Sequence, residues 1–174
     1  MKMLTGIASV VIGCVVVAAP AAAASSDKLP AASRYYPLVG HWKGKGELTS
    51  PGQPAVKLAL KLSCYKVSSG WAVRCAMSAR NGKMVMTELD LFGVDPVTGQ
   101  GHWYAITNQG ETHDHLTEWT DTRTMKAHYG WKEGGKQMLE NIVLKLPARR
   151  TLEFRSVVTA DGQQAGAFSG KLAR

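Results

Sequence analysis

Two histidines separated by one residue, His113 and His115, are the first candidates for chemistry in this sequence. Side chains two positions apart in a strand point to the same side, so both imidazoles could face one metal ion. A zinc site would need a third protein ligand, which His102, His128 or Glu118 could supply. The same pattern is typical of a polar segment at the end of a strand, and we prefer this second interpretation. We therefore predict no metal and no other cofactor here.

Three carboxylates form a second candidate group, because Glu88, Asp90 and Glu140 fall at positions expected to face the interior. A buried carboxylate is costly unless it is paired, hydrogen-bonded or hydrated. These residues predict either a structural network with an inward cation such as Lys66, or a ligand site. Paired carboxylates could also act as a catalytic acid and base. The sequence has no Ser-His-Asp set, nucleophile motif or phosphate loop, so an enzyme is the less favoured class and no catalytic residue is predicted.

Aromatic side chains could complete a ligand site around these carboxylates. Trp71 and Trp131 lie near hairpin ends on the expected inner face, where they could line a cavity mouth and stack on a ligand. A two-residue loop at Gly134-Gly135 would place Tyr129 opposite Glu140 and so add a hydroxyl group. The predicted ligand-binding residues are Trp71, Glu88, Asp90, Tyr129, Trp131 and Glu140.

A turn signal at Ser69-Gly70 determines the expected position of the two cysteines downstream of Cys14. A two-residue loop there would place Cys64 opposite Cys75 on neighbouring strands. Directly paired residues have Cα separations of about 4.5 to 5.5 Å, which a disulfide tolerates. The alternative is a pair of small buried thiols. An even number of cysteines in an exported chain favours the disulfide, which we predict.

A second turn signal, Asn81-Gly82, is among the strongest for a hairpin, because both central residues of a type I′ turn need positive φ. A loop at these residues would place Met77 opposite Met86. Glu88 and Asp90 would then share one face with the apolar residues of the three strands. A one-residue change in register would turn these carboxylates outward.

Turn signals at regular intervals divide the rest of the chain into short alternating segments, with no sustained helical period. The expected strands are 41–49, 55–67, 71–80, 83–94, 101–108, 112–120, 124–132, 137–146, 150–159 and 164–172. Short strands joined by tight hairpins predict an all-β, antiparallel up-and-down barrel of about ten strands over 38–174. Residues 25–37 are rich in Ala, Ser and Pro and predict a flexible lead-in, with a short turn at Tyr35-Tyr36-Pro37 that covers one end of the domain.

Two motifs resemble those of a known superfamily. Gly40-His41-Trp42 is similar to the G-x-W signature at the first strand of calycins, in which Gly lets the chain bend and Trp plugs one end of the core. Phe92–Gly99 is similar to a hairpin of an uncharacterised group of secreted bacterial lipocalin-like domains. The resemblance covers nearly all of the mature domain and implies a cavity and a small ligand, with no established chemistry. Nitrobindin-like barrels, which are similar in strand count, hold haem through a histidine near the end of their chain. No His follows His128 in this sequence, which argues against a haem site of that kind.

The N-terminus is typical of a secretory signal peptide over residues 1–24. Lys2 precedes an apolar run over Leu4–Ala19, and small residues lead to a cleavage site near Ala24. The expected product is a periplasmic or secreted protein with no transmembrane segment. The alternative is a lipoprotein attached through Cys14, which is less consistent with the apolar residues that follow this cysteine.

The chain of 174 residues has a formal charge of +8, but its basic residues are spread along the sequence. Nucleic-acid binding is not expected, because its usual footprint is a clustered basic face. The leading hypothesis is an exported barrel that binds a small, partly apolar ligand in its lumen. The alternatives are a metal-dependent protein or enzyme using the His113/His115 region, and a cell-envelope interaction module with a filled lumen.

Overall fold

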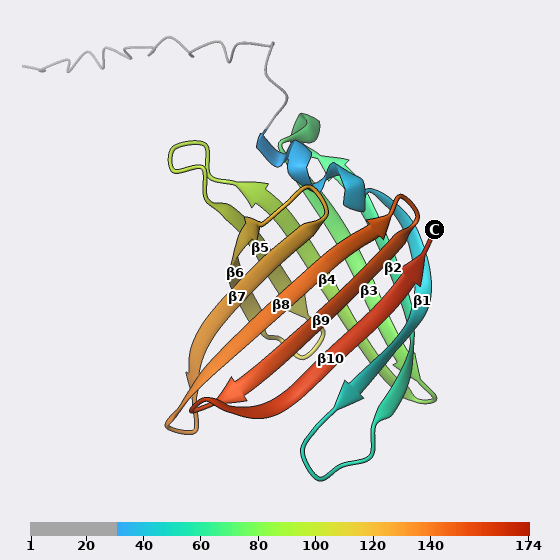
Figure 1. Cartoon of the computed structure of the whole chain (residues 1–174), viewed down its shortest axis with the longest axis vertical. Coiled ribbons are helices and arrows are strands. Elements are labelled where there is room, and N and C mark those ends of the chain that lie inside the picture. The colour runs from blue at the N-terminus through green and yellow to red at the C-terminus, as the bar shows by residue number, and fades with distance from the viewer. Residues whose placement is uncertain (1–30) are drawn as a thin grey trace, which may run out of the picture.

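The computed structural model describes residues 31–174, which form a closed antiparallel barrel of ten strands (Figure 1). Each strand pairs with its neighbours in sequence, and the first strand closes the ring by pairing with the last. The strands are β1 (Gly40–Thr49), β2 (Val56–Val67), β3 (Ala72–Asn81), β4 (Met84–Val94), β5 (Gly101–Thr107), β6 (Thr112–Trp119), β7 (Thr124–Glu133), β8 (Lys136–Ala148), β9 (Thr151–Ala160) and β10 (Gln163–Ala173).

This strand order confirms the predicted fold class, and each predicted strand begins and ends within two residues of the observed one. The closed ring leaves no unpaired sheet edge, which explains why a chain of consecutive hairpins is stable in this form. The predicted signal peptide, its cleavage site and Cys14 lie outside the described residues and stay predictions.

Two of the three predicted hairpin registers are confirmed. Cys64 lies opposite Cys75 in the β2–β3 pair, and a disulfide joins them as expected. Tyr129 lies opposite Glu140 in the β7–β8 pair. The loops at Ser69-Gly70 and Gly134-Gly135 therefore orient these strands as the sequence indicated.

The third register, between β3 and β4, is wrong by two residues. Met77 lies opposite Glu88 and not Met86, because the loop consists of Gly82-Lys83 rather than Asn81-Gly82. Gly82 has a φ of 54°, while neither neighbour takes a positive φ, so the turn belongs to the kind that begins with glycine. A shift of two residues preserves the alternation of the strand, so the inner face is unchanged.

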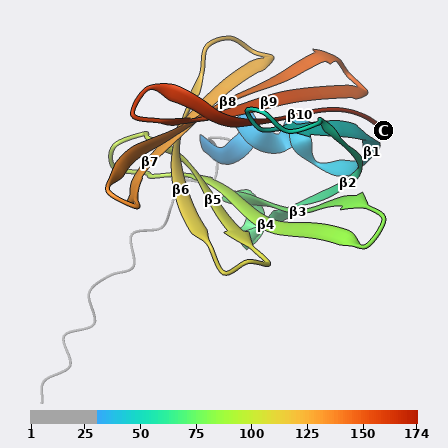
Figure 2. The ribbon, with the colours of Figure 1, turned by 90° about the horizontal axis from the view of Figure 1, so that it is seen from below.

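A 3-10 helix, η1 (Ala31–Leu38), lies across one end of the barrel and is seen through the ring of strands in Figure 2. Tyr35 and Leu38 are buried, and the Tyr35 hydroxyl lies 2.6 Å from Thr117 Oγ1 on β6. The expected turn at residues 35–37 is thus part of a packed plug, and residues 31–37 are not the flexible lead-in that their composition suggested. Apolar contacts made by Tyr35 and Leu38 offset the weak local propensity of this segment.

Trp42 on β1 completes the plugged end, as its motif predicts. Its side chain is buried and its Nε1 donates to the Leu38 carbonyl at 2.7 Å, which ties the barrel to η1. The guanidinium carbon of Arg174 lies 4.2 Å from the centre of the Trp42 indole. Gly44 allows the closing strand to approach, since a Cβ there would lie 1.9 Å from the Lys171 carbonyl oxygen on β10.

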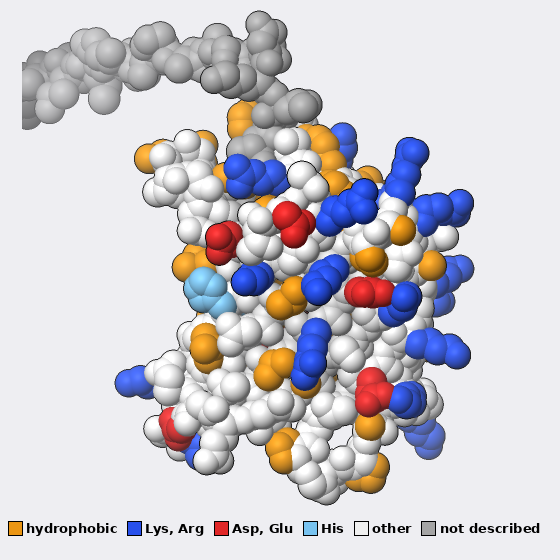
Figure 3. Space-filling view, viewed as in Figure 1, with side chains coloured by type: hydrophobic (Ala, Val, Ile, Leu, Met, Phe, Trp, Pro, Cys, Tyr) orange, Lys and Arg blue, Asp and Glu red, His pale blue; other side chains and the backbone are white. Residues whose placement is uncertain are grey.

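The outer face of the barrel carries scattered Lys and Arg side chains with a few acidic residues between them (Figure 3). Within 31–174, no helix has the length and apolar character needed to cross a membrane. Carboxylates accompany some of the basic groups, as where Lys171 Nζ lies 2.8 Å from Glu153. The distribution is that of a solvated surface and not of a clustered basic face.

Candidate functional site

The barrel encloses a cavity of about 340 Å³, and Leu38 of η1 is one of its lining residues. Alternation along the strands sends every second side chain inward, so most of the wall is apolar. The apolar lining includes Leu62, Met77, Met86, Ile142, Phe154 and Phe168. Polar side chains are few and come mainly from β4, β6 and β8, where they face the same space.

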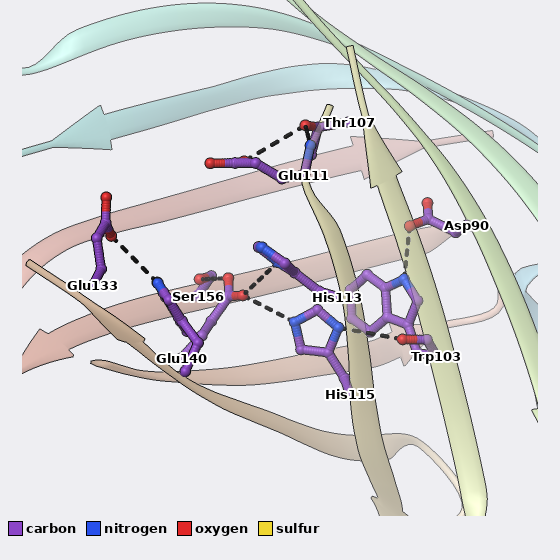
Figure 4. A network of polar contacts seen from close by, with 10 residues as sticks. Asp90, Trp103, Thr107, Glu111, His113, His115, Glu133, Glu140 and Ser156 are labelled. Carbon is purple, nitrogen blue, oxygen red and sulfur yellow. Dashed lines mark hydrogen bonds and ion pairs between the residues drawn. The ribbon is translucent and has the colours of Figure 1, made fainter. Parts of the chain in front are cut away.

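The histidines and one of the carboxylates, which the sequence analysis treated as separate candidate sites, lie together in the structure. His113 and His115 of β6 meet Glu140 of β8 (Figure 4). One donor atom from each of the three residues lies within 4.8 Å of the other two. His115 Nε2 is 2.9 Å from Glu140 Oε2, and His113 Nδ1 is 3.9 Å from the same oxygen. We call these three residues the histidine–glutamate cluster.

Two members of the cluster, His115 and Glu140, each have a second hydrogen-bond partner that orients them. His115 Nδ1 donates to the Trp103 carbonyl at 3.2 Å, and the Ser156 hydroxyl donates to Glu140 Oε1. Burial alone would raise the pKa of Glu140, but hydrogen bonds from His115 and Ser156 and the nearby imidazoles outweigh burial and lower it. Glu140 is therefore ionised at neutral pH although most of its side chain is inaccessible.

Two aromatic rings of β7 hold the His113 imidazole. Its ring is stacked on Tyr129 at 4.6 Å between centres and on Trp131 at 5.6 Å. The Trp131 indole lines the cavity and donates to Glu133 at 3.3 Å. Tyr129 lies behind His113 and does not line the cavity itself. The two predicted aromatic residues thus support the histidine and narrow its choice of rotamer.

A second polar group, the carboxyl pair Glu88 and Asp90, lies on the inner face of β4. Trp103 Nε1 donates to Asp90 Oδ1 at 2.6 Å. Burial, and then the charge of Asp90 and a hydrogen bond to it, raise the pKa of Glu88 to about 9. Burial also raises the pKa of Asp90, against the hydrogen bonds that it accepts from Glu88 and Trp103. Glu88 is therefore a neutral acid at pH 7 that donates to Asp90.

Four of the predicted ligand residues line this same cavity, namely Glu88, Asp90, Trp131 and Glu140. Tyr129 packs against Trp131 and His113. Trp71 does not line the cavity, since it is 52% exposed and the prediction that it faces inward is wrong. The reason is local: Ser69 lies in a 3-10 turn with a φ of 55°, and Trp71 caps this turn before the strand alternation begins.

The other expected partners also lie elsewhere. Lys66, the proposed inward cation, is exposed and its ammonium lies over the Tyr36 ring of η1. His102 pairs with Asp114 at 3.0 Å, and His128 is exposed, so neither reaches the cluster. Glu118 also lies outside it.

Two residues of the site, Trp103 and Ser156, were not anticipated from the sequence, and neither was the role of Glu140 as the partner of both histidines. Trp103 and Ser156 lie on β5 and β9, and the faces of β5 look mixed in the sequence. The loop between β6 and β7 has no Gly-containing turn signal, so the sequence does not determine which residues of these two strands lie opposite each other. The positions of the histidines relative to Glu140 on β8 could therefore not be predicted. A fixed β6–β7 register would have revealed the contact.

No protein-family model and no curated protein matches this sequence. Solved structures do. Rv2717c from M. tuberculosis superposes with a TM-score of 0.63 at 15% identity, over 85% of this chain and 99% of that one. The S-type phycobiliprotein lyase CPES from Guillardia theta has a TM-score of 0.60 at 9% identity, over 82% of this chain and 90% of its own.

A third similar structure is a protein of unknown function from the DUF3598 family of Nostoc punctiforme. It matches with a TM-score of 0.53 at 13% identity, over 80% of this chain and 48% of its own length. Identities this low establish the fold alone. The fold shared with them is the closed antiparallel barrel described above.

Proposed function

We propose that this barrel binds a small, partly apolar molecule in its lumen. The observation that carries the proposal is the cavity of about 340 Å³, whose apolar wall holds a few converging polar groups. Most small-molecule sites have this composition, and the volume lies at the lower end of their usual range. The ligand is therefore compact, and one barrel accommodates one molecule.

The arrangement of the wall indicates which parts of the ligand are polar. The histidine–glutamate cluster offers an ionised carboxylate and imidazoles from β6 and β8. Glu88, a neutral acid whose proton is donated to Asp90, leaves its second oxygen as an acceptor on β4. A ligand with an apolar body and a hydrogen-bonding group at each of these places would satisfy both without leaving a buried charge unpaired.

The structural comparison supports a binding role without identifying the ligand. One similar structure is a phycobiliprotein lyase, which means that a barrel of this shape occurs in a protein that acts on phycobiliproteins. The envelope-module alternative requires a filled lumen, so the cavity weighs against it.

An exported location belongs to the same proposal, as does membership of the secreted lipocalin-like group. The Cys64–Cys75 disulfide supports export, since such bonds persist in oxidising compartments. We expect the isolated mature chain to begin near Ser25, without lipid and without free thiols. Intact-mass measurement after alkylation without reductant tests all three statements. A mature chain that begins at an acylated Cys14 would contradict the proposed location.

Binding in the lumen can be tested with N-phenyl-1-naphthylamine, a small apolar probe whose fluorescence rises in apolar surroundings. Ala105 lines the cavity, so Ala105→Phe should fill the lumen and weaken saturable probe binding at least about tenfold, the loss of roughly 1.4 kcal/mol. Ala76→Phe, on the exposed outer face of β3, is the matched control and should leave binding unchanged.

Thermal unfolding of both variants verifies that each is folded before binding is compared. Probe binding that survives Ala105→Phe but falls in Ala76→Phe would assign the apolar site to the outer surface. That result would refute a lumen ligand.

A further inference from the structure

We propose that His113, His115 and Glu140 bind a divalent transition-metal ion, with Zn²⁺ as the reference ion. Two imidazoles and one carboxylate form the donor set of many catalytic zinc sites and of non-haem iron sites. The proposal stands independently of the lumen ligand, because the three donors are already together in the protein. It replaces the third ligands that the sequence suggested with a residue from β8.

The two separations between Glu140 and the histidine nitrogens bracket the spacing of a tetrahedral site, and all three donor atoms lie within 4.8 Å of one another. Zinc bonds of about 2.0 to 2.2 Å place neighbouring ligand atoms about 3.3 Å apart. The two distances to Glu140 Oε2, 2.9 Å from His115 and 3.9 Å from His113, lie on either side of this value. Metal binding would draw the His113 and His115 donor atoms toward Glu140 Oε2 by side-chain rotation.

The surrounding contacts are those that orient metal ligands. A ligating histidine usually donates its other ring N–H to a carbonyl, as His115 Nδ1 does to Trp103. A ligating carboxylate usually accepts a further hydrogen bond, as Glu140 Oε1 does from Ser156. The Tyr129 ring stacked on His113 restricts the third ligand.

The hydrogen bonding of His115 leaves a place for a cation. The Trp103 carbonyl can only accept, so Nδ1 carries the proton of a neutral His115, and Nε2 then presents a lone pair. This lone pair faces a carboxylate oxygen 2.9 Å away. Either a second proton or a metal ion must lie between these two acceptors.

Local charge favours the metal ion over a proton alone. Within 31–174, the ion pairs of Glu140 involve only the two histidines and no Lys or Arg. The side chains of His115 and Glu140 are 3% and 15% exposed, so water neutralises this charge only weakly. The cluster also lines the cavity, so a bound ion would have a position open to water or to a ligand atom.

Titration calorimetry with Zn²⁺ on chelator-treated full-length mature protein tests the proposal. We expect one ion per chain with a dissociation constant below about 1 μM, and at least about 100-fold weaker binding in His113→Ala. His128→Ala is the matched control, because His128 is exposed on the outer side of β7. It should bind Zn²⁺ as the unchanged protein does. Co²⁺ should give the intense visible bands of a four- or five-coordinate ion.

A measurement on the unchanged protein keeps the test valid if the variants unfold. In long-range ¹H–¹⁵N spectra, Zn²⁺ should shift His115 Nε2 and His113 Nδ1 and leave the His128 nitrogens in place. Absence of stoichiometric binding, or binding that His128→Ala removes and His113→Ala preserves, would overturn the proposal. The cluster would then be a set of hydrogen-bonded side chains without a metal ion.

Discussion

Two glutamates of one cavity, Glu88 and Glu140, have opposite acid–base properties. Both lie on inner faces and both are largely buried, and burial raises the pKa in each case. The neighbour of Glu88 is another carboxyl group, Asp90, which raises the pKa of Glu88 further. The neighbours of Glu140 are His115 and Ser156, which donate hydrogen bonds and reverse the effect of burial.

The charge of each glutamate is therefore determined by the groups that contact it and not by how deeply it is buried. The β4 wall presents a neutral acid, and the β8 wall presents a carboxylate beside imidazoles. A ligand between them meets an uncharged carboxyl group on one side and a negative group on the other. Substitutions in one wall at a time, in protein freed of metal by chelation, separate the contributions of the two walls to stability.

The largest effect is expected for Glu140→Gln, which leaves buried His115 without its carboxylate. Removing one partner of a buried pair should lower the free energy of unfolding by about 3 kcal/mol. Urea unfolding at pH 7 measures this change. Glu153→Gln removes the exposed partner of Lys171 and should cost no more than about 1 kcal/mol. Equal losses in the two variants would show that the β8 cluster is not a buried pair.

A change of opposite sign is expected for Glu88→Gln on the other wall. Between pH 4.5 and about 9 the folded protein keeps a proton on Glu88 that the unfolded chain releases. Its free energy of unfolding therefore falls as pH rises through this window, by at most about 1.4 kcal/mol per pH unit. Glutamine cannot lose a proton, so the variant should be more stable by about 1 to 3 kcal/mol at pH 8.

Thermal unfolding of the Glu88→Gln variant and the unchanged protein across pH 5 to 9 measures the effect. The melting temperature of the variant should depend less on pH. A variant that is less stable than the unchanged protein at pH 8, or equally pH-dependent, would contradict the assignment of Glu88 as a neutral acid.

A smaller loss is expected for Trp103→Phe, which keeps the ring and removes the indole donor to Asp90. Leaving a buried acceptor without its donor costs about 1 to 3 kcal/mol. Because Asp90 also accepts from Glu88, we expect about 1.5 kcal/mol of destabilisation by urea unfolding. In a double-mutant cycle with Asp90→Asn, additive effects would show that the two side chains do not interact.

The smallest effect is expected for Ser156→Ala, which removes one of the donors to Glu140. The loss should be about 1 kcal/mol, because His115 still satisfies the carboxylate. The NMR-measured pKa of Glu140 should rise at the same time, since this hydrogen bond stabilises the ionised form. A pKa that stays constant would assign the lowering to the histidines alone.

The fold was predictable because short Gly-containing sequence motifs mark several of its hairpin turns. Ser69-Gly70 and Gly134-Gly135 gave the correct register of their hairpins, and with it the disulfide between Cys64 and Cys75. Asn81-Gly82 gave the correct face with the wrong pairing, since Gly82 and not Asn81 takes the positive φ. Alternation tolerates an error of two residues but not of one.

The site was less predictable, because it depends on distances across strands that no turn signal fixes. Each of His115 and Glu140 was recognised as a candidate, but the contact between them crosses β7. Trp103 could not be oriented on a strand with two mixed faces. Trp71 was predicted to face inward and does not. Positive φ angles at Ser68, Ser69 and Gly70 interrupt the alternation of side chains, which resumes only when β3 begins at Ala72. Three-residue constellations that span several strands need the whole register, and local sequence supplies only parts of it.

The pairing of β1 with β10 also constrains how the chain acquires its structure. Hairpins can form in succession as residues emerge from a ribosome or a translocation channel. The outer edge of β1 can pair only after β10 is present, since Lys43 lies opposite Ala173. Until then, strand edges that the finished ring lacks stay open to other chains. Pairing the two ends of the sheet closes the longest loop in the barrel, so it carries the largest loop-closure entropy of the ten strand pairings. Kinetic vulnerability to aggregation is therefore concentrated in the interval before the last strand arrives.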